Sequence, residues 1–232
     1  PKPNSTEAPL GYGDLGQNLE FDWDMYPHFH MLNSHSQKLY KQVFANAEDA
    51  LEKFAPCVDV STNELKNVME AVYNDHPELF WLDTAFSCKY GDNGFVTEID
   101  LAFNETATKL EDSKKEFNKV ADPIISTAKV LPDDYEREKY IYDTLLEMVE
   151  YDKEAEMNQS AYSALVNGKS VCAGYSRAFQ YLMQKSGIPC YYSTGYAGGN
   201  HAWNIVNLYG DYYNVDCTWG DQEAISYQYF NQ

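Results

Sequence analysis

Three strand-like runs near the carboxyl end of the chain constrain its fold most strongly. They cover residues 190–196, 201–208 and 211–219, and only Tyr209-Gly210 separates the last two. A two-residue connection of this kind is typical of a β-hairpin, so these two runs are expected to pair antiparallel. The break at residues 197–200 is rich in glycine and sets the first run apart as a neighbouring strand.

The hairpin turn also fixes the register of the two paired runs. It places Asp216 opposite Trp203 and His201 opposite Thr218. Because side chains alternate along a strand, His201 and Trp203 share a face, and Asp216 becomes the diagonal neighbour of His201 at roughly 7–8 Å. A slip by one residue would put the imidazole and the carboxylate on opposite faces.

A helix is expected immediately before these strands. Apolar residues keep helical spacing through residues 176–185, and Ser186-Gly187-Ile188-Pro189 carries the glycine and proline signals of a helix end. Cys172 therefore lies at or near a helix amino terminus. Unpaired backbone N–H groups at that position favour a thiolate and could also stabilise an oxyanion.

Cys172, His201 and Asp216 together suggest a nucleophile, a base and an orienting carboxylate. A thiol is only slightly ionised at neutral pH, so a nucleophilic cysteine needs a base beside it, and the imidazole needs a partner that fixes its tautomer. The other four cysteines, none in a CxxC pair, are interpreted as small buried apolar residues, with a disulfide between some of them left open: Cys57, Cys88, Cys190 and Cys217.

Three blocks around these residues resemble the transglutaminase-like superfamily, and its bacterial members most closely. They are Gly168–Ala178, which contains GKSVCAGYSRA, His201–Val206, which reads HAWNIV, and Tyr212–Trp219, which reads YYNVDCTW. The resemblance covers about residues 135–220. It implies an α+β, papain-like core with an antiparallel sheet and a nucleophile helix. It also implies that Cys172 is the nucleophile, His201 the base and Asp216 the orienter.

Two of the departures from the family pattern concern single positions. Gly220 intervenes between Trp219 and Asp221, where relatives usually have an acidic residue directly after the Thr-Trp pair. Val166 occupies the position at which papain-type proteases carry an oxyanion glutamine. The side-chain oxyanion donor is therefore unassigned, with Gln159 and Tyr162 as candidates.

The remaining sequence predicts an amino-terminal extension to this core. Residues 1–32 are expected to be a largely irregular linker or tether, residues 33–130 an α/β region and residues 131–232 the transglutaminase-like catalytic core. Expected elements are helices over 34–55, 61–74, 105–122 and 132–150, and a hairpin over 81–90 and 95–103.

Charge and composition narrow the classes of partner. The net charge of −19 disfavours nucleic acid and anionic membrane surfaces. No apolar run is long enough to span a membrane. The opening Pro1–Thr6 resembles a tether left after removal of a signal, which favours an extracellular or cell-surface location. No metal or other cofactor is expected, since His28, His30 and His35 lack partners at ligand spacing.

The expected activity is thiol-dependent acyl transfer on peptide or glutamine amides through a cysteine thioester. Hydrolysis, by a protease or amidase, is favoured over transamidation. A protein-crosslinking transglutaminase and a non-catalytic surface binding module remain as alternatives. The substrate is expected to be a protein or peptide, with Tyr175 and Trp203 among the residues that line its groove. The sequence does not define the oligomeric state.

Overall fold

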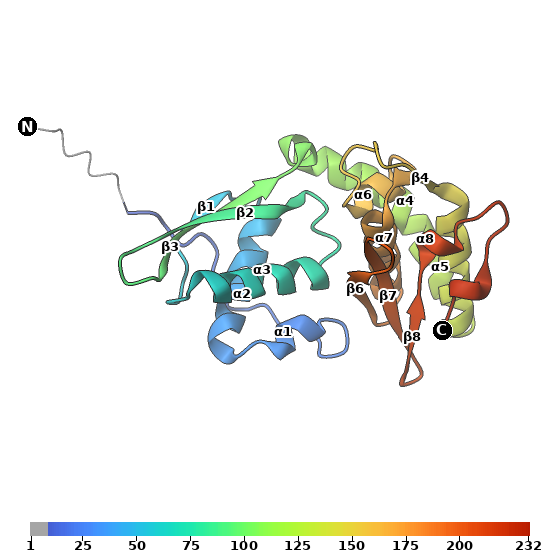
Figure 1. Cartoon of the computed structure of the whole chain (residues 1–232), viewed down its shortest axis with the longest axis horizontal. Helices are drawn as coiled ribbons and strands as arrows, with labels where there is room; N and C mark the ends of the chain where they lie inside the picture. The colour runs from blue at the N-terminus through green and yellow to red at the C-terminus, as the bar shows by residue number, and fades with distance from the viewer. Residues whose placement is uncertain (1–8) are drawn as a thin grey trace, which may run out of the picture.

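The computed structural model describes residues 9–232, so the first eight residues of the tether predicted over residues 1–32 lie outside the described range. Figure 1 shows an amino-terminal half and a carboxy-terminal half, with α4 (Leu110–Lys129) leading from one to the other. The first half contains α1 (Pro27–Met31), α2 (Ser34–Glu48), β1 (Lys53–Phe54), α3 (Thr62–Asp75), β2 (Leu82–Tyr90), β3 (Val96–Phe103) and the 3₁₀ helix η1 (Glu105–Lys109). The second contains α5 (Asp134–Met148), β4 (Glu150–Tyr151), α6 (Ala161–Leu165), β5 (Lys169–Ser170), α7 (Cys172–Lys185), β6 (Cys190–Tyr196), β7 (Asn200–Leu208), β8 (Asp211–Val215), α8 (Cys217–Gly220) and the 3₁₀ helix η2 (Tyr227–Tyr229).

The first half is built on an antiparallel sheet with strand order β1-β3-β2. The predicted hairpin is confirmed as β2 and β3. The predicted capping box at the start of α3 is also confirmed, because Ser61 and Glu64 each bond to the backbone of the other. The helix predicted over residues 34–55 is too long. It ends at Glu48, and Ala50 then adopts a positive φ of 51° before β1.

The predicted stop of a helix near Pro123 is wrong, since α4 continues through Pro123 to Lys129. The apolar face of this helix explains the continuation. Phe117, Ile124 and Ile125 are all buried on α4, so ending the helix at the proline would remove two of the three from the core. Burial of that face offsets the hydrogen bond that the proline removes from the helix.

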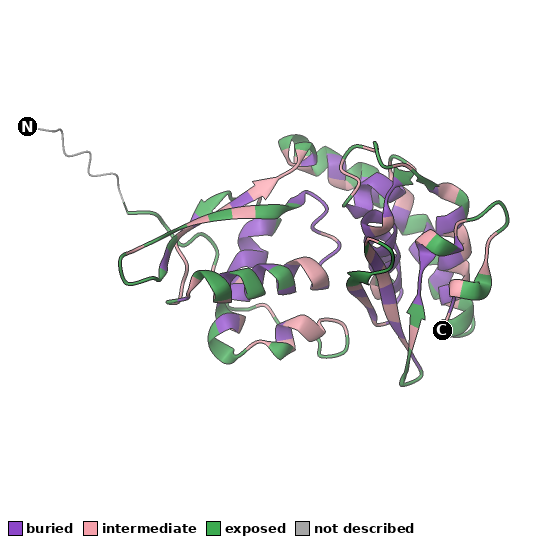
Figure 2. Ribbon diagram, viewed as in Figure 1, coloured by how far each residue is buried: buried purple, intermediate pink, exposed green. Residues whose placement is uncertain are grey.

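The second half packs α7 against the antiparallel sheet β6-β7-β8. Figure 2 shows α7 buried along most of its length, at the centre of this half. The amide of Asn204 on β7 donates to the carbonyl oxygen of Ser176 on α7 at 2.9 Å and joins helix to sheet. The predicted turn is confirmed, because Tyr209 and Gly210 both have positive φ, 57° and 96°, as a tight hairpin turn requires.

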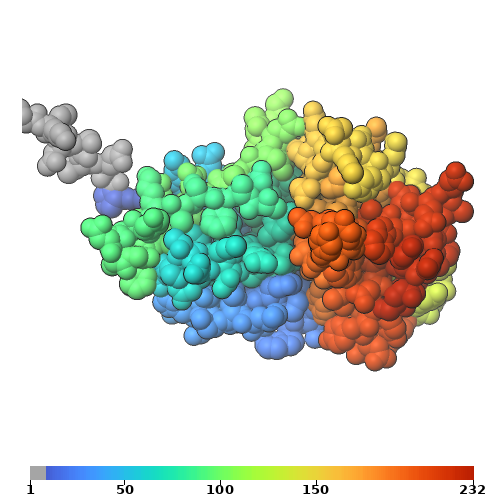
Figure 3. All heavy atoms as spheres, viewed as in Figure 1, coloured from blue at the N-terminus to red at the C-terminus, as the bar shows by residue number. Residues whose placement is uncertain are grey.

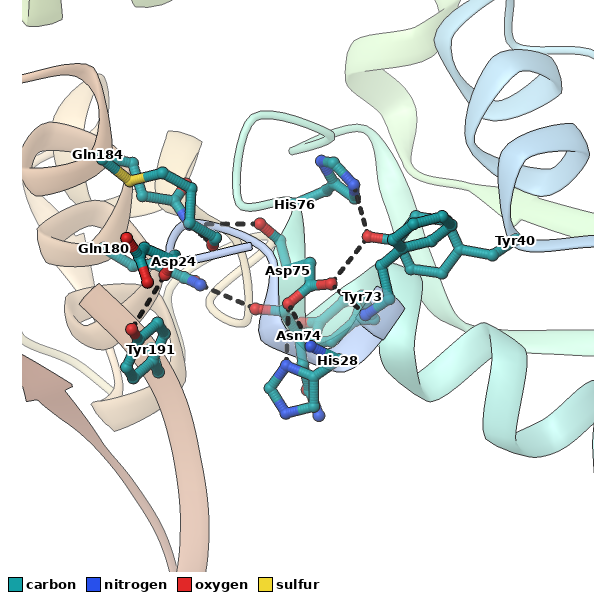
Figure 4. A network of polar contacts seen from close by, with 12 residues as sticks. Asp24, His28, Tyr40, Tyr73, Asn74, Asp75, His76, Gln180, Gln184 and Tyr191 are labelled. Carbon is teal, nitrogen blue, oxygen red and sulfur yellow. Dashed lines mark hydrogen bonds and ion pairs between the residues drawn. The ribbon is translucent and has the colours of Figure 1, made fainter. Parts of the chain in front are cut away.

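Polar side chains of α7 cap the carboxyl end of α3 and so join the two halves. Arg177 donates to the carbonyl oxygens of Tyr73 and His76, and Gln180 donates to that of Asn74 at 2.7 Å. Gln184, one turn further along α7, donates to the carbonyl oxygen of Asp75 (Figure 4). These donors satisfy carbonyl groups that a helix end leaves without intrahelical partners.

The Asp75 side chain holds the segment before α2 against the same helix end. This buried carboxylate accepts from the backbone N–H groups of His28 and Phe29 and from the Tyr40 hydroxyl (Figure 4). The residues before α2 were predicted to be a linker. Their described part has an irregular backbone apart from α1, but it packs against the rest of the chain, and Phe29 is buried.

One apolar cluster of buried residues extends through both halves, from Phe29 to Phe230. Figure 3 shows the two halves in contact along their shared boundary. The α+β class with an antiparallel sheet and a central helix is confirmed. The division of the chain at residue 130 stays a prediction. Within residues 9–232, no helix combines the length and the apolar character that crossing a bilayer requires.

Candidate active site

Cys172 is the first residue of α7, as the sequence predicted. The preceding residue, Val171, provides no side-chain cap, so the first-turn N–H groups remain available to an anion at this end of the helix. The thiol is partly exposed, whereas Cys190 and Cys217 are buried and burial raises the pKa of both well above its ordinary value. Cys172 is therefore far better placed than either buried thiol to react as a thiolate.

His201 and Asp216 form a direct, partly shielded pair. Nε2 of His201 lies 2.6 Å from Oδ2 of Asp216, and the two side chains are 10% and 12% exposed. Oδ1 of Asp216 accepts the backbone N–H of Trp219 at 3.0 Å, which fixes the carboxylate plane. In the tautomer in which Nε2 donates to Asp216, Nδ1 of His201 carries the lone pair that a general base needs.

Cys172 lies beside the strand that carries His201, and its described contact with that strand is through Ala202 and not through the His201 ring. Cys172 packs against a small apolar cluster that includes Val171, Ala173 and Tyr192 and also Ala202, the residue that follows His201 on β7. The nucleophile candidate thus lies beside the strand end that carries the base candidate. A helix start and a paired strand are rigid supports, which catalytic geometry requires.

The predicted hairpin register is confirmed where β7 and β8 pair, from Leu208 opposite Asp211 to Asn204 opposite Val215. The third strand was predicted to run on to Trp219, and this is wrong because β8 stops at Val215. Asp216 instead caps the short helix α8 by accepting from Trp219. An aspartate three residues before an available N–H is a capping signal, and here it competes with continuation of the strand.

The start of α8 brings Trp219 onto His201. Their rings are stacked with centroids 4.8 Å apart, and Trp203 stacks on His201 from a centroid distance of 6.2 Å. Trp203 is held by a hydrogen bond from its Nε1 to Asn214, and a Cβ at Gly195 would approach its ring to 2.7 Å. The missing side chain at Gly195 therefore makes room for the indole.

A cavity of about 310 Å³ opens beside the His201–Asp216 pair, and its walls are mainly aromatic. It is lined by His201, Asp216, Trp203, Trp219, Tyr229 and Tyr196 among others. Trp203 thus lies at a cavity next to the candidate base, whereas its predicted role in substrate binding stays a proposal. Trp219 was not singled out in the sequence, although its position after a capping aspartate carried the signal.

The prediction that Tyr175 lines a substrate groove is wrong. Its side chain is fully buried, and its hydroxyl contacts the carbonyl oxygen of Val149 and the Asp221 carboxylate. Burial and the neighbouring Asp221 raise the pKa of Tyr175 well above its usual range. Tyr175 lies one turn after Cys172, where a helix that packs on a sheet must turn its side chains into the core.

The unusual Gly220 has a steric explanation. A Cβ at Gly220 would lie 1.7 Å from the Tyr142 hydroxyl, so no other residue fits without movement of its neighbours. The inserted glycine lets the chain pass Tyr142 and brings Asp221 to the Tyr175 hydroxyl. The inserted glycine thus changes the contacts beside α7, and the His201–Asp216 pair keeps its hydrogen bond.

The two candidates for an oxyanion donor differ in their surroundings. The Tyr162 hydroxyl is bonded to Glu116, and its ring is buried, which argues against a role at Cys172. Gln159 is exposed and belongs to a loop that lies close to the first turn of α7, where a Cβ at Gly174 would collide with that loop. The Gln159 amide donates to Oδ1 of Asn158 at 3.1 Å, so its role as an oxyanion donor stays a prediction.

Tyr73, which the sequence analysis missed, reaches this site from α3. Its ring packs against the same cluster as Cys172 and meets the Tyr192 ring edge-on at 6.2 Å. Its hydroxyl donates to the carbonyl oxygen of Gln159 at 3.3 Å. No local pattern in the sequence marks this tyrosine, because its neighbours here lie about a hundred residues further along the chain.

The three histidines considered for a metal site have other partners. His28 pairs with Asp75, His30 bonds to the carbonyl oxygen of Phe21 and His35 to that of Asp59. Residues 9–232 contain no group of three or more histidine, cysteine or acidic side chains arranged to hold a metal ion.

Comparison with known proteins shows which family the region around this site resembles. The family model of the transglutaminase-like superfamily matches residues 119–217, which include Cys172, His201 and Asp216. Residues 119–217 thus match the core of that superfamily, and the resemblance predicted for this region, with an α+β papain-like fold, is confirmed.

Similar proteins cover only part of the chain. A kyphoscoliosis peptidase from Mus musculus is 32% identical over 105 residues, and that from Homo sapiens is 31% identical over the same length. The matched region is 38% of this chain but only 16% of each relative, so the chain spans a small part of their length. A solved structure of a TGase matches with 13% identity and a TM-score of 0.40, covering 72% of this chain and 50% of that one.

Proposed function

We propose that the chain is a thiol-dependent acyltransferase or hydrolase that acts on peptide or glutamine amides through Cys172, His201 and Asp216. The observation that carries the proposal is the His201–Asp216 hydrogen bond of 2.6 Å at the end of the strand beside Cys172. A buried carboxylate that orients an imidazole, on the strand beside a helix that starts with a thiol, supports thiol acyl transfer, for which the imidazole must reach the thiol.

The first half-reaction would begin with proton transfer from the Cys172 thiol to Nδ1 of His201. The thiolate then adds to the amide carbonyl, and the backbone N–H groups at the start of α7 stabilise the oxyanion. Collapse of this intermediate breaks the C–N bond, and the imidazolium returns the proton to the departing amine. Asp216 stabilises the imidazolium in between and remains ionised. The product is a thioester on Cys172.

We favour water as the acceptor in the second half-reaction. His201 would deprotonate the water, the hydroxide would displace the thiolate from the acyl carbon, and the acid product would leave. The partial exposure of Cys172 is compatible with access by water. The relatives that match the core region are named peptidases, which supports the same direction.

Transamidation is the second candidate, and one observation favours it. The cavity beside His201 has aromatic walls that include Trp203 and Trp219. The π faces of such rings attract ammonium groups and exclude water, both of which help an amine to compete for the thioester. The cavity would then hold the alkyl chain of a primary amine next to the base that deprotonates it.

Two measurements test these proposals. At pH 6, iodoacetamide should label Cys172 faster than it labels free cysteine, with the partly exposed Cys88 as internal reference; equal rates would refute an activated nucleophile. Incubation of the chain with a peptide library and a labelled primary amine, read by mass spectrometry, separates the acceptors. Cleaved or deamidated peptides indicate water, and incorporated label indicates an amine. Cys172→Ala should abolish all three products and leave the fold intact.

A further inference from the structure

A groove of about 360 Å³ lies between α3 and β2, outside the catalytic residues described above. Lys66, Met69 and Tyr73 line it from the helix, and Leu82, Thr84 and Phe86 line it from the strand. Met69 and Leu82 are buried and form an apolar floor, whereas Lys66 and Thr84 lie exposed at the rim. This combination of an apolar floor and a polar rim is typical of a ligand groove.

Tyr73 connects this groove to the candidate active site. It lines the groove from the last turn of α3, and it also packs against the cluster that contains Cys172. The Arg177 guanidinium lies 3.6 Å from the centre of the Tyr73 ring and holds the ring in place. A ligand that extends along the groove past Tyr73 therefore arrives at Cys172, the nucleophile candidate. The groove and the aromatic cavity that His201 lines share no lining residue.

The strand side of the groove is a free sheet edge. In the sheet β1-β3-β2, β2 is an outer strand, and within residues 9–232 no strand pairs with its other edge. The pairing of β2 with β3 also shifts register between Leu82 and Phe86, so residues 83–85 lie outside the ladder. Asp83 and Thr84 line the groove, and the Ala85 N–H donates to the Asp83 carboxylate at 3.1 Å. Unpaired backbone groups on an outer strand are the usual docking site for an extended peptide.

We propose that this groove binds the acyl-donor peptide in an extended conformation along residues 82–86 of β2, with Tyr73 as the specificity-determining residue where the peptide passes to Cys172. The inference rests on the proposed function, because it places the substrate of the same nucleophile. Apolar peptide side chains would enter between Met69 and Phe86, and the peptide backbone would pair with the edge of β2. The amino-terminal half then supplies the substrate-binding wall of the enzyme.

The test uses substitutions that block the groove and do not change Cys172, His201 or Asp216. Thr84→Trp places an indole at the rim, and Ser87→Trp places the same indole on an exposed position of β2 that does not line the groove. In a Cys172→Ala background, fluorescein-labelled unfolded casein serves as the probe, and its affinity is read by fluorescence anisotropy. Thr84→Trp should weaken binding at least about tenfold, and Ser87→Trp less than about twofold. Lys66→Trp, from the helix side, should act like Thr84→Trp.

The kinetic readout separates this inference from the proposed function. With Cys172 present, Thr84→Trp should raise KM for casein-derived peptides and leave the iodoacetamide labelling rate of Cys172 unchanged. Casein that does not bind the Cys172→Ala chain, or that binds Thr84→Trp and Ser87→Trp equally, overturns the groove assignment. If iodoacetamide labels Cys172 no faster than free cysteine, the proposed function is overturned instead. The casein-binding result does not depend on this labelling rate. Far-ultraviolet circular dichroism verifies the fold of each variant.

Discussion

Replacement of Glu138 by glutamine should make the stability of the protein far less dependent on pH. Glu138 lies on α5, is fully buried, and accepts a hydrogen bond from the Asn231 amide at 2.8 Å. Burial raises its pKa to about 7, although the Asn231 amide opposes this. Oε1 of Glu138 and Oδ1 of Asn231 have no hydrogen-bond partner among the described residues. A proton on Oε1 supplies the donor that both atoms lack, and glutamine supplies it permanently.

The magnitude follows from the two ionisation constants. The unfolded glutamate has a pKa of 4.5, so raising the pKa to about 7 in the folded state corresponds to about 3 kcal/mol at most. Because the folded pKa is the higher one, this stability is fully present below pH 4.5 and is lost as the pH rises through about 7. Glu138→Gln should therefore match the native chain near pH 4.5 and exceed its stability at pH 8.5 by up to about 3 kcal/mol.

Urea denaturation at pH 4.5 and pH 8.5 measures this difference, provided that fluorescence and circular dichroism give coincident transitions. Glu147→Gln is the matched control, since Glu147 is an exposed carboxylate on the same helix. Its effect should stay within about 0.5 kcal/mol at both pH values. A Glu138→Gln effect of equal size at pH 4.5 and pH 8.5 would contradict a buried glutamate that titrates near neutrality.

Three further substitutions probe the site and the joint between the halves. Asp216→Asn should lower kcat by about a hundredfold to ten-thousandfold with little change in KM, because an amide does not stabilise the imidazolium of His201; steady-state kinetics that retain native kcat would argue against the triad. Gly220→Ala should destabilise the chain by about 1–3 kcal/mol in urea, since its Cβ meets a hydroxyl, and Gly199→Ala, with open space around it, should have little effect. Arg177→Lys should cost about 1–3 kcal/mol, because a lysine has no planar fork for two carbonyl oxygens; an unchanged urea midpoint would show that this cap is dispensable.

The sequence was sufficient where local signals specified long-range pairing. The Tyr209-Gly210 turn determined the register of β7 and β8, and with it the approach of Asp216 to His201. The glycine and proline after residue 185 marked the end of α7 and so placed Cys172 at its start. In these cases turn or cap chemistry, strand alternation and motif order all favoured the same geometry, which is the condition under which a sequence specifies a site.

Prediction failed where two local rules competed or where the contact was tertiary. Asp216 could extend β8 or cap α8, and capping prevailed, which moved Trp219 onto His201. Pro123 is ordinarily a helix breaker, but the buried face of α4 overrode it. Tyr73 gave no signal at all, because its position beside Cys172 depends on how α3 meets α7.

The candidate site is a composite of both halves, and the hydrogen bonds between them explain why. Arg177 caps the end of α3 and also lies against the Tyr73 ring, five residues after Cys172 on the same helix. One helix therefore carries the nucleophile candidate and holds the wall beside it. The backbone N–H of Asp216 donates to the carbonyl oxygen of Tyr229, so the carboxy-terminal segment holds the backbone of Asp216 in place. A shift of α3 against α7 would change the proposed substrate wall and leave the His201–Asp216 pair in place, so the proposed binding and the proposed chemistry rest on separate contacts within a single apolar core.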